Sequence, residues 1–310
     1  MLKIGIAQSM LYYDFSEFFH EYFKSLGLEI ILSPKTNVNI LNEGVGSCVD
    51  EACLPVKIFH GHVSYLSDKV DYIFIPRIIS SYKREYYCPK QLGLADMTKH
   101  SIDNLPKLID PVMHLDSQRN IKKSLYDLGS FFKFDKNLIK IATKNASRIL
   151  DKDNKKESFL GDKGKVNLLI AGHPYIIEDD FINMNIRNKL ENKAKLIFSK
   201  DFNEFDIRES ASSFKKRIFW THGIDIVGSA YYAIDNAIID GIIYLSAFGC
   251  GLDSVLINLL ENKIYDTNLP LLILNLDEQT GEAGFNTRLE AFLDMIDWRW
   301  KNENKLSTSR

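Results

Sequence analysis

The feature that most constrains this fold is the alternation of short apolar runs with longer segments of helical periodicity. Residues 2–7 and 28–32 are apolar runs of strand length, and between them the aromatic residues from Phe15 to Phe23 recur at helical spacing. A further strand is predicted at 70–75, closed by Pro76. Strands and helices that alternate with these lengths predict βαβ units, and therefore a parallel sheet with helices on its faces.

Local signals indicate where two of these helices begin. Asp14, with Glu17 three residues later, matches a capping box, so Asp14 is predicted to cap the first helix. Pro55 is favoured at the first helical position, and it predicts a further helix with an apolar face that includes Val56 and Leu66. Both helices would connect predicted strands, as βαβ units require.

The alternation pauses between residues 105 and 164 and then resumes. That stretch is rich in Lys, Asp, Asn and Ser, and its apolar positions have helical spacing. Beyond it, strands are predicted at 166–171, 194–199, 241–247 and 269–276, and helices at 181–193, 224–236, 252–260 and 283–299. The chain is therefore predicted to be an α/β protein with two Rossmann-like lobes, each doubly wound around a mainly parallel sheet. The predicted division is an N-terminal lobe at 1–110, a helical connector and linker at 111–164, and a C-terminal lobe at 165–310.

Composition excludes several classes of function. The formal net charge is −2 and the basic residues are scattered, which gives no general attraction for nucleic acid or an anionic membrane. Residues 1–10 are too short and strand-like for a signal peptide, and no run of about 18 uncharged apolar residues predicts a membrane span. Four cysteines without an export signal favour a reducing compartment. We therefore expect a cytoplasmic protein whose thiols are buried, reactive or bound to metal.

Three of the four cysteines stand where ligand sites form in parallel α/β folds. Cys88 lies in the loop after the strand 70–75, and Cys250 follows the strand 241–247 almost directly. Cys53 lies just before the helix of Pro55, and a helix N-terminus stabilises a thiolate. Isolated cysteines are also common as small buried hydrophobes, and four residues between Cys48 and Cys53 match neither the common zinc nor the ferredoxin spacing. The residues alone therefore leave both a metal site and an inert core open.

Five separated motifs give the chain a family resemblance. They are DEACLPVK at 50–57 with HGH at 60–62, KREYYCPK at 83–90 with GLAD at 93–96, GHPY at 172–175 with NMN at 183–185, SAFGCG at 246–251 with DS at 253–254, and DEQTGEAG at 277–284 with TRLE at 287–290. Together they resemble the acyl-CoA dehydratase activase-related proteins, which are relatives of the D-component of 2-hydroxyacyl-CoA dehydratases and of the double-cubane cluster proteins. The resemblance covers nearly the whole chain, in order.

The resemblance implies a redox function. Relatives are built from Rossmann-like lobes and hold a cubane cluster by three cysteines per subunit, which here match Cys53, Cys88 and Cys250. It implies a [4Fe-4S] cluster between the lobes, either alone or linked into a double cubane. It also implies an electron from a separate ATP-hydrolysing iron–sulfur activator, a small-molecule or acyl-CoA substrate to be reduced or dehydrated, and a homodimer. The chain has no G-x-x-x-x-G-K-[ST] loop, so it is expected to be the acceptor of that electron.

Other side chains are candidates for proton transfer or substrate binding. His173 follows the strand 166–171, and His222 follows the extended stretch 217–221, so both are expected at crevice edges. Thr280 and Glu282 lie in the loop after the strand 269–276, and Glu282 is a candidate to move a proton. The alternatives are that each histidine satisfies a backbone carbonyl, and that Thr280 or Glu282 caps the last helix.

Two other functions stay open on the sequence. One is a two-lobed binding protein whose cysteines are structural or hold zinc, and the other is a scaffold that partners an activator without chemistry of its own. Cys48 falls outside the three cysteines that match the family. It is a fourth ligand, a link to a larger cluster or a plain core thiol.

Overall fold

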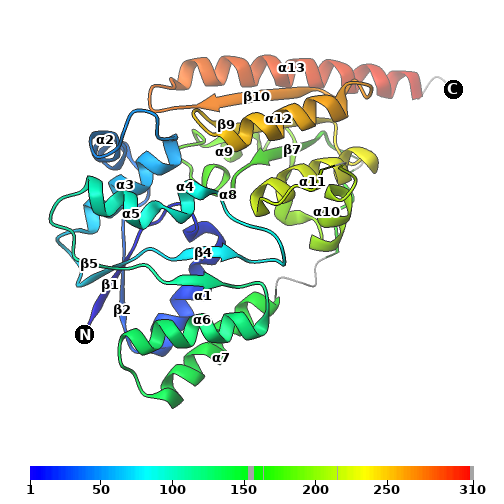
Figure 1. The fold of residues 1–310 in the computed structure, drawn as a ribbon. Helices are drawn as coiled ribbons and strands as arrows, with labels where there is room; N and C mark the ends of the chain where they lie inside the picture. The colour runs from blue at the N-terminus through cyan, green and yellow to red at the C-terminus, as the bar shows by residue number, and fades with distance from the viewer. Residues whose placement is uncertain (153–156, 163, 215, 308–310) are drawn as a thin grey trace. The chain divides into compact units, whose positions relative to one another are not determined.

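The computed structural model describes residues 1–152, 157–162, 164–214 and 216–307 (Figure 1). The chain forms two compact units. Unit 1 comprises Met1–Lys155 together with Phe219–His222, and unit 2 comprises Lys156–Ile218 together with Gly223–Arg310. The chain thus leaves unit 2 for four residues and then returns to it.

Unit 1 is an α/β unit built on parallel strands. Its strands are β1 (Lys3–Ile6), β2 (Glu29–Leu32), β3 (Tyr72–Phe74), β4 (Arg77–Ser80), β5 (Lys107–Ile109) and β6 (Val112–His114). Its helices are α1 (Tyr12–Ser25), α2 (Val38–Gly46), α3 (Leu54–Leu66), α4 (Pro89–Leu92), α5 (Leu94–Ser101), α6 (Gln118–Phe131) and α7 (Lys136–Lys152). The main sheet has the order β2-β1-β3-β5, and all its pairs are parallel. The predicted α/β class is therefore confirmed in this unit.

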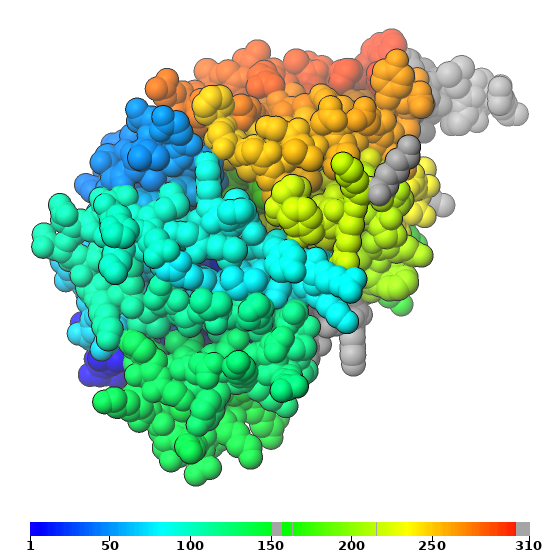
Figure 2. Space-filling model, viewed as in Figure 1, coloured from blue at the N-terminus to red at the C-terminus, as the bar shows by residue number. Residues whose placement is uncertain are grey.

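The aromatic face of α1 forms the core on one side of this sheet. Phe18, Tyr22 and Phe23 are almost fully buried, and they belong to one hydrophobic cluster with Ile4 of β1 and residues of α6 and α7. Figure 2 shows that the side chains of α6 and α7 cover much of unit 1 on the face drawn. The stretch 118–152, which the sequence predicts as part of a helical connector, thus packs on α1.

Helices α2 and α3 cross at two glycines. A Cβ atom added to Gly44 would lie 1.9 Å from the carbonyl oxygen of Lys57, and one added to Gly61 would lie 1.9 Å from the carbonyl oxygen of Ile40. Only glycine allows the two backbones to approach this closely. The crossing brings the end of α2, next to Cys48, against the helix that begins after Cys53.

A second ladder extends the sheet toward Cys88. β4 and β6 pair in parallel just beyond β3 and β5, and the amide of Ile75 donates to the carbonyl of Ile109 between the two ladders. Arg77 at the start of β4 makes ion pairs with Asp96 and Asp110, which fixes this strand to α5 and to the β5–β6 turn. The loop after β4 then leads to Cys88.

Unit 2 repeats the strand order of unit 1. Its strands are β7 (Asn167–Gly172), β8 (Lys195–Ile197), β9 (Gly241–Ala247) and β10 (Leu271–Leu276), in the order β8-β7-β9-β10 and all parallel. Its helices are α8 (Pro174–Ile177), α9 (Ile186–Leu190), the 3-10 turn Ser199–Asp201, α10 (Glu204–Ala211), α11 (Thr221–Asp235, which begins in unit 1), α12 (Gly251–Ile264) and α13 (Glu282–Ser307). β7 and β9 are fully buried along their whole length, as expected of central parallel strands. This confirms the prediction of two lobes with the same Rossmann-like plan.

Three local predictions are wrong. α1 begins at Tyr12 after Leu11, so Asp14 lies inside the first turn and is not the cap. The helix predicted at 181–193 is shorter, because the left-handed backbone of Met184 and Asn185 separates α9 from the preceding turn. The stretch 217–221 is not a strand and contains only an isolated bridge between Trp220 and Tyr86.

Among the described residues, no helix is both long enough and apolar enough to span a bilayer.

Candidate metal centre

Cys53 is positioned by the start of α3. It is the N-cap residue of this helix, its backbone is extended (φ −67°, ψ 151°), and its carbonyl accepts the amides of Val56 and Lys57. Pro55 stands in the first turn, where its missing N–H costs nothing. Cys53 is buried. The helix begins at Leu54, one residue before the predicted first position at Pro55, and its N-terminal partial positive charge lies beside this thiol.

Cys53 and two lysines interact with the Cys48 thiol. Cys48 is half-buried, and burial raises the pKa of its thiol. The neighbouring Cys53 raises this pKa further, whereas Lys57 and Lys90 lower it. These four residues are thus near enough to interact electrostatically. Lys57 is 3 % exposed, so its ammonium group adds positive charge inside the protein near the Cys48 thiol.

Cys88 has the same local setting as Cys53. It is the N-cap of the short helix α4, with Pro89 directly after it and an extended backbone (φ −56°, ψ 136°). The preceding loop is held by a bridge in which the amide of Tyr86 donates to the carbonyl of Phe219 at 2.7 Å and the amide of Thr221 donates to the carbonyl of Tyr86 at 3.0 Å. Both bridge partners belong to the four-residue segment 219–222 of unit 1.

His222 lies in this segment, in the first turn of α11. Its Nε2 atom is 3.2 Å and 3.3 Å from the two carboxylate oxygens of Asp14, and its ring packs edge-on against Tyr87. The Tyr87 hydroxyl in turn bonds to Ser81. His222 is therefore part of the structure next to Cys88, and its partner is a carboxylate that the sequence assigns to helix capping.

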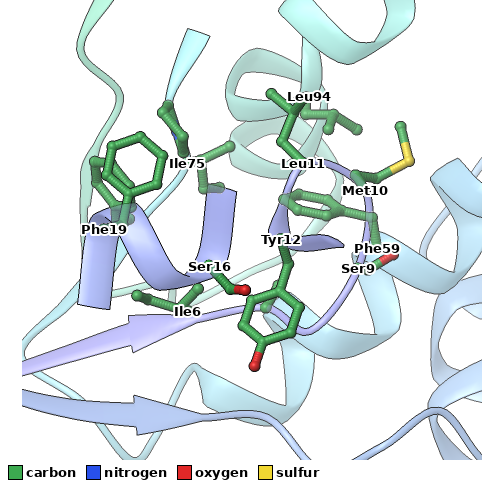
Figure 3. A pocket seen from close by; sticks show the side chains of 13 residues that line it. Ile6, Ser9, Met10, Leu11, Tyr12, Ser16, Phe19, Phe59, Ile75 and Leu94 are labelled. Atoms are coloured by element: carbon green, nitrogen blue, oxygen red, sulfur yellow. The ribbon is translucent and has the colours of Figure 1, made fainter. Parts of the chain in front are cut away.

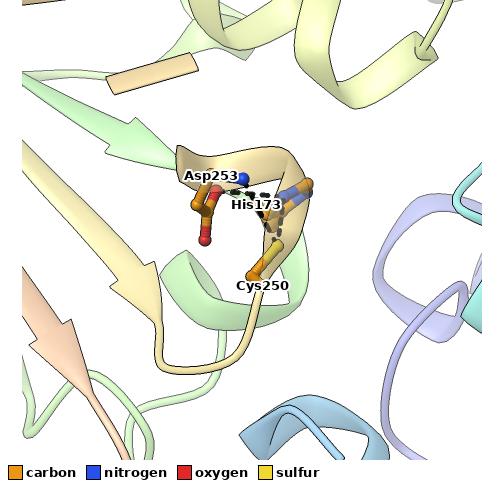
Figure 4. Close-up of side chains that lie close together, drawn as sticks. All are labelled: His173, Cys250 and Asp253. Carbon is orange, nitrogen blue, oxygen red and sulfur yellow. Dashed lines mark hydrogen bonds and ion pairs between the residues drawn. The ribbon is translucent and has the colours of Figure 1, made fainter. Parts of the chain in front are cut away.

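In unit 2, His173, Cys250 and Asp253 converge (Figure 4). His173 follows β7 and precedes α8, whereas Cys250 is the N-cap of α12 and Asp253 lies in its first turn. The Nε2 atom of His173 is 3.2 Å from Oδ1 of Asp253 and 4.0 Å from Sγ of Cys250. The three ligand atoms all lie within 4.8 Å of one another. The third predicted cysteine thus shares its surroundings with the predicted catalytic histidine.

Asp253 organises this group. Its carboxylate accepts the Tyr244 hydroxyl at 2.7 Å and the Ala247 amide at 3.0 Å, and its own amide donates to Cys250 Sγ at 3.5 Å. Burial raises the pKa of Asp253, but His173, Tyr244 and the Ala247 amide together outweigh burial and hold the pKa below its usual range. Burial, Asp253 and Cys250 raise the pKa of Tyr244 well above its ordinary value, so Tyr244 remains a donor to the carboxylate.

This geometry suits a metal better than a nucleophilic relay. In a Cys-His-Asp relay the acid bonds to one ring nitrogen and the nucleophile to the other. Here Asp253 and Cys250 both face Nε2 of His173. A thiolate, an imidazole and a carboxylate that point toward one another are ligands for zinc or iron.

The remaining candidates lie at the start of α13. The Thr280 hydroxyl donates to Oδ1 of Asp277 at 2.7 Å and accepts the Asp277 amide at 2.8 Å. Glu282 is the first residue of α13 and forms an ion pair with Lys189 at 2.7 Å, and this bond with Lys189 lowers its pKa. Thr280 also lines a cavity of about 220 Å³ beside β10. The roles predicted for both residues in catalysis stay predictions.

The site contains residues to which the sequence analysis assigned no role, although Asp253 is part of a family motif. Asp253 and Tyr244 both lie beside Cys250. Asp253 gives a local sequence signal, because it is an acidic residue three positions after a helix N-cap, whereas Tyr244 gives none. The expected convergence of three thiols stays a prediction, because Cys53 and Cys88 belong to unit 1 and Cys250 belongs to unit 2.

Comparisons with known proteins identify the family. The family model described as the CoA enzyme activase uncharacterised domain (DUF2229) matches residues 3–202, and that of the 2-hydroxyglutaryl-CoA dehydratase D-component matches residues 225–296. No curated protein matches the chain.

Two solved structures of the SBP FpvC from Pseudomonas aeruginosa resemble it weakly. The complex with Ni²⁺ is 10% identical, with 96% of this chain and 94% of that chain covered and a TM-score of 0.28. The complex with Mn²⁺ is 9% identical, with 96% of each chain covered and the same TM-score of 0.28.

Because the first family model spans well over half of the sequence, this chain belongs to the CoA enzyme activase DUF2229 family, and its C-terminal part is related to the 2-hydroxyglutaryl-CoA dehydratase D-component.

Proposed function

We propose that this chain is an iron–sulfur redox protein of the 2-hydroxyacyl-CoA dehydratase type, in which Cys53, Cys88 and Cys250 ligate a [4Fe-4S] cluster. The observation that carries the proposal is a shared setting. Each of these three cysteines is the N-cap residue of a helix, and none is in a disulfide. The two family matches include all three positions.

The donor chemistry fits such a cluster. Iron–sulfur clusters are held by cysteine thiolates, and a helix N-terminus favours the thiolate over the thiol. Lys57 and Lys90 add positive charge close to Cys48, which itself interacts with Cys53, and positive charge in this region offsets the negative charge of a thiolate-bound centre. A bound cluster would supply one-electron chemistry.

The chain's own residues would then control protons near Cys250. Asp253 holds the ring of His173 in place, with Nε2 directed at the carboxylate and at Cys250 Sγ. His173 can therefore hold or deliver a proton at Nε2 beside this thiolate. Thr280 and Glu282 are assigned to substrate binding and proton transfer at the rim of unit 2, with Lys189 holding Glu282 as a carboxylate.

The proposal includes partners. An ATP-hydrolysing iron–sulfur activator supplies the electron, a small-molecule or acyl-CoA substrate is reduced or dehydrated, and two copies of the chain associate. The family assignment supports the activator partner, because its models are named for CoA enzyme activases and for a dehydratase component, whereas the substrate and the association of two copies remain proposals.

The test is the metal content of protein purified without oxygen. We expect about four iron and four sulfide per chain, and loss of most of both in the separate variants Cys53→Ala, Cys88→Ala and Cys250→Ala. Cys48→Ala is the matched control and keeps most of the iron. Equal loss in all four variants would show that the ligand assignment is wrong.

A second candidate is a mononuclear metal site in unit 2. The convergence of His173, Cys250 and Asp253 within 4.8 Å favours it. In that case the protein is colourless, it binds one zinc per chain, and Asp253→Ala removes the metal as completely as Cys250→Ala does. Stoichiometric zinc with no sulfide would replace the iron–sulfur proposal with this one.

A further inference from the structure

Unit 1 contains an apolar cavity at the carboxyl ends of two neighbouring strands. The cavity has a volume of about 40 Å³. Its walls come from the loop after β1, from the end of β3, from α1, and from one residue each of α3 and α5 (Figure 3). All lining residues belong to unit 1.

The cavity lies where the connections of the sheet change direction. β1 pairs with β2 on one side and with β3 on the other, so the chain first winds one way from β1 and later returns to its other edge. In open parallel sheets the crevice at this point, outside the carboxyl ends of the strands, is the usual ligand site. In unit 2 the equivalent strands are β7 and β9, and His173 and Cys250 follow them.

The chemistry of the two equivalent positions differs. Residues 7–11 after β1 read AQSML and contain no glycine, so this loop lacks the close backbone approach that a phosphate cradle requires. The cavity walls are aliphatic and aromatic, with hydroxyls of Ser9, Tyr12 and Ser16 as the only polar side-chain groups and with no charged residue. Cavities of this kind exclude water and bind apolar molecules.

Met10 has an unusual backbone for its side chain. Its φ of 55° lies in the left-handed region, which a non-glycine residue adopts only where the surrounding structure requires it. The residue is nevertheless 3 % exposed and lines the cavity. A flexible methionine side chain adapts to ligands of slightly different shape.

The cavity is also connected by helix α3 to the proposed cluster ligands. Phe59 lines it from α3, six residues after Cys53, which is about 9 Å along the helix axis. Leu94 lines it from α5, six residues after Cys88. The helix that lines the cavity through Phe59 is thus the one that Cys53 caps, and Leu94 belongs to the helix that follows the short helix of Cys88.

We propose that this cavity binds the apolar end of a short aliphatic acyl chain, and so selects short-chain acyl-CoA substrates. That the bound aliphatic group is part of an acyl-CoA rests on the proposed function. That the site prefers an apolar ligand rests on the cavity itself. A volume of about 40 Å³ exceeds what one water molecule needs, yet it leaves room for only a few carbon atoms without rearrangement.

The experiment uses the full chain, purified without oxygen and labelled with ¹³C at the methionine methyl groups. The sequence has six methionines, so Met10 can be assigned from the signal lost in Met10→Leu. Butyryl-CoA is expected to shift the Met10 signal with saturation, and CoA alone is expected to leave it in place. If CoA alone shifts Met10 equally, or if no acyl-CoA shifts it, the proposal is wrong. A response to 1-butanol without a response to butyryl-CoA would also overturn it, because the cavity would then be a packing void.

Two variants test the size selection. Leu94→Ala enlarges the cavity, and it is expected to change the preference from butyryl-CoA toward octanoyl-CoA by about tenfold in Kd. Leu125→Ala removes a fully buried leucine of the same unit outside the cavity, so it controls for lost stability and leaves the preference unchanged. An unchanged preference in Leu94→Ala, or the same change in Leu125→Ala, would contradict the proposal. Iron and sulfide content is measured separately, so failure of the cluster proposal and failure of the acyl site remain distinguishable.

Discussion

At the scale of single residues, Asp253 is a buried carboxylate of unit 2 that depends on its hydrogen-bond partners. Its side chain is 2 % exposed, and its carboxylate accepts two hydrogen bonds while it also faces His173. A buried carboxylate without partners is very costly, so these neighbours are what allow the charge to remain. The same carboxylate fixes the loop that carries Cys250, because it accepts the amide of Ala247.

The variant Asp253→Asn is expected to reduce the free energy of unfolding by about 1–3 kcal/mol at pH 7, because an amide NH₂ replaces one buried acceptor. The folded pKa of Asp253 is lowered, so this contribution is complete above the unfolded value of about 3.9 and is lost as the pH falls through the folded value. Urea unfolding measures the change. Asp297→Asn, at a side chain that is 55 % exposed, is the control and should change stability by less than about 0.5 kcal/mol. An equally small effect at Asp253 would refute the assignment.

His62 makes the stability of unit 1 depend on pH. It is fully buried in α3, its Nε2 lies 3.0 Å from the Thr36 hydroxyl, and burial lowers its pKa to about 4. The unfolded chain binds the proton more tightly, so the stability that His62 contributes is present above about pH 6.5 and decreases as the pH falls toward 4. We expect wild type, compared with His62→Gln, to lose about 1 kcal/mol per pH unit in this range. Imidazole NMR signals give the pKa directly, and titration of His62 near 6.5 would contradict the prediction.

At the scale of elements, the crossing of α2 and α3 depends on two glycines. Gly44→Ala would place a Cβ atom 1.9 Å from the Lys57 carbonyl oxygen, so the helices must move apart. We expect a loss of at least about 2 kcal/mol in the free energy of unfolding, measured with urea. Gly46→Ala is the matched control in the same helix, because nothing lies within 4 Å of its added Cβ atom. It should be neutral or stabilising by up to about 1 kcal/mol. Similar losses in both variants would show that helix propensity, and not the crossing, determines the effect.

The elements predicted well from the sequence are those whose pattern is local and long. β9 and β10 lie within about two residues of their predicted ranges, since both appear as continuous apolar runs, although β9 is a buried central strand and β10 is a partly buried edge strand. α2 was not predicted, because Val38–Gly46 contains two glycines and depends on its crossing with α3. β4, β5 and β6 are three or four residues long and occur among charged residues, so no period can be recognised in them.

The candidate site was predictable to a similar extent. The N-cap setting of Cys53 follows from the Pro55 signal, and the position of Cys250 follows from the strand before it. The pairing of Asp14 with His222 joins residues 208 positions apart, and no local pattern contains it. Asp14 was predicted to cap α1, because a capping box looks the same in sequence whether or not the helix starts one turn earlier.

At the scale of the whole molecule, two units with the same strand order use their equivalent crevices differently. In unit 2, His173 and Cys250 at this position form a polar group with Asp253. In unit 1 the position is apolar, and the proposed ligands Cys53 and Cys88 instead precede α3 and α4. The same strand order thus gives unit 2 a polar position, which suits the proposed thiolate-bound centre. It gives unit 1 an apolar position, which suits the proposed acyl chain.

The segment Phe219–His222 gives the last prediction, because it is the part of the C-terminal half that belongs to unit 1. It holds the loop before Cys88 through the amide of Tyr86, which donates to the Phe219 carbonyl, and it is held in turn by His222 and Asp14. In His222→Ala the segment loses this contact, so the amide of Tyr86 should exchange its hydrogen roughly tenfold faster, which corresponds to about 1.4 kcal/mol. The amide of Ile75, bonded to Ile109 within the sheets, is the internal control and should keep its rate. Equal acceleration at both amides would indicate general destabilisation, and no acceleration at Tyr86 would mean that the bridge holds without the histidine. Either result would remove His222 from the group of residues that position Cys88.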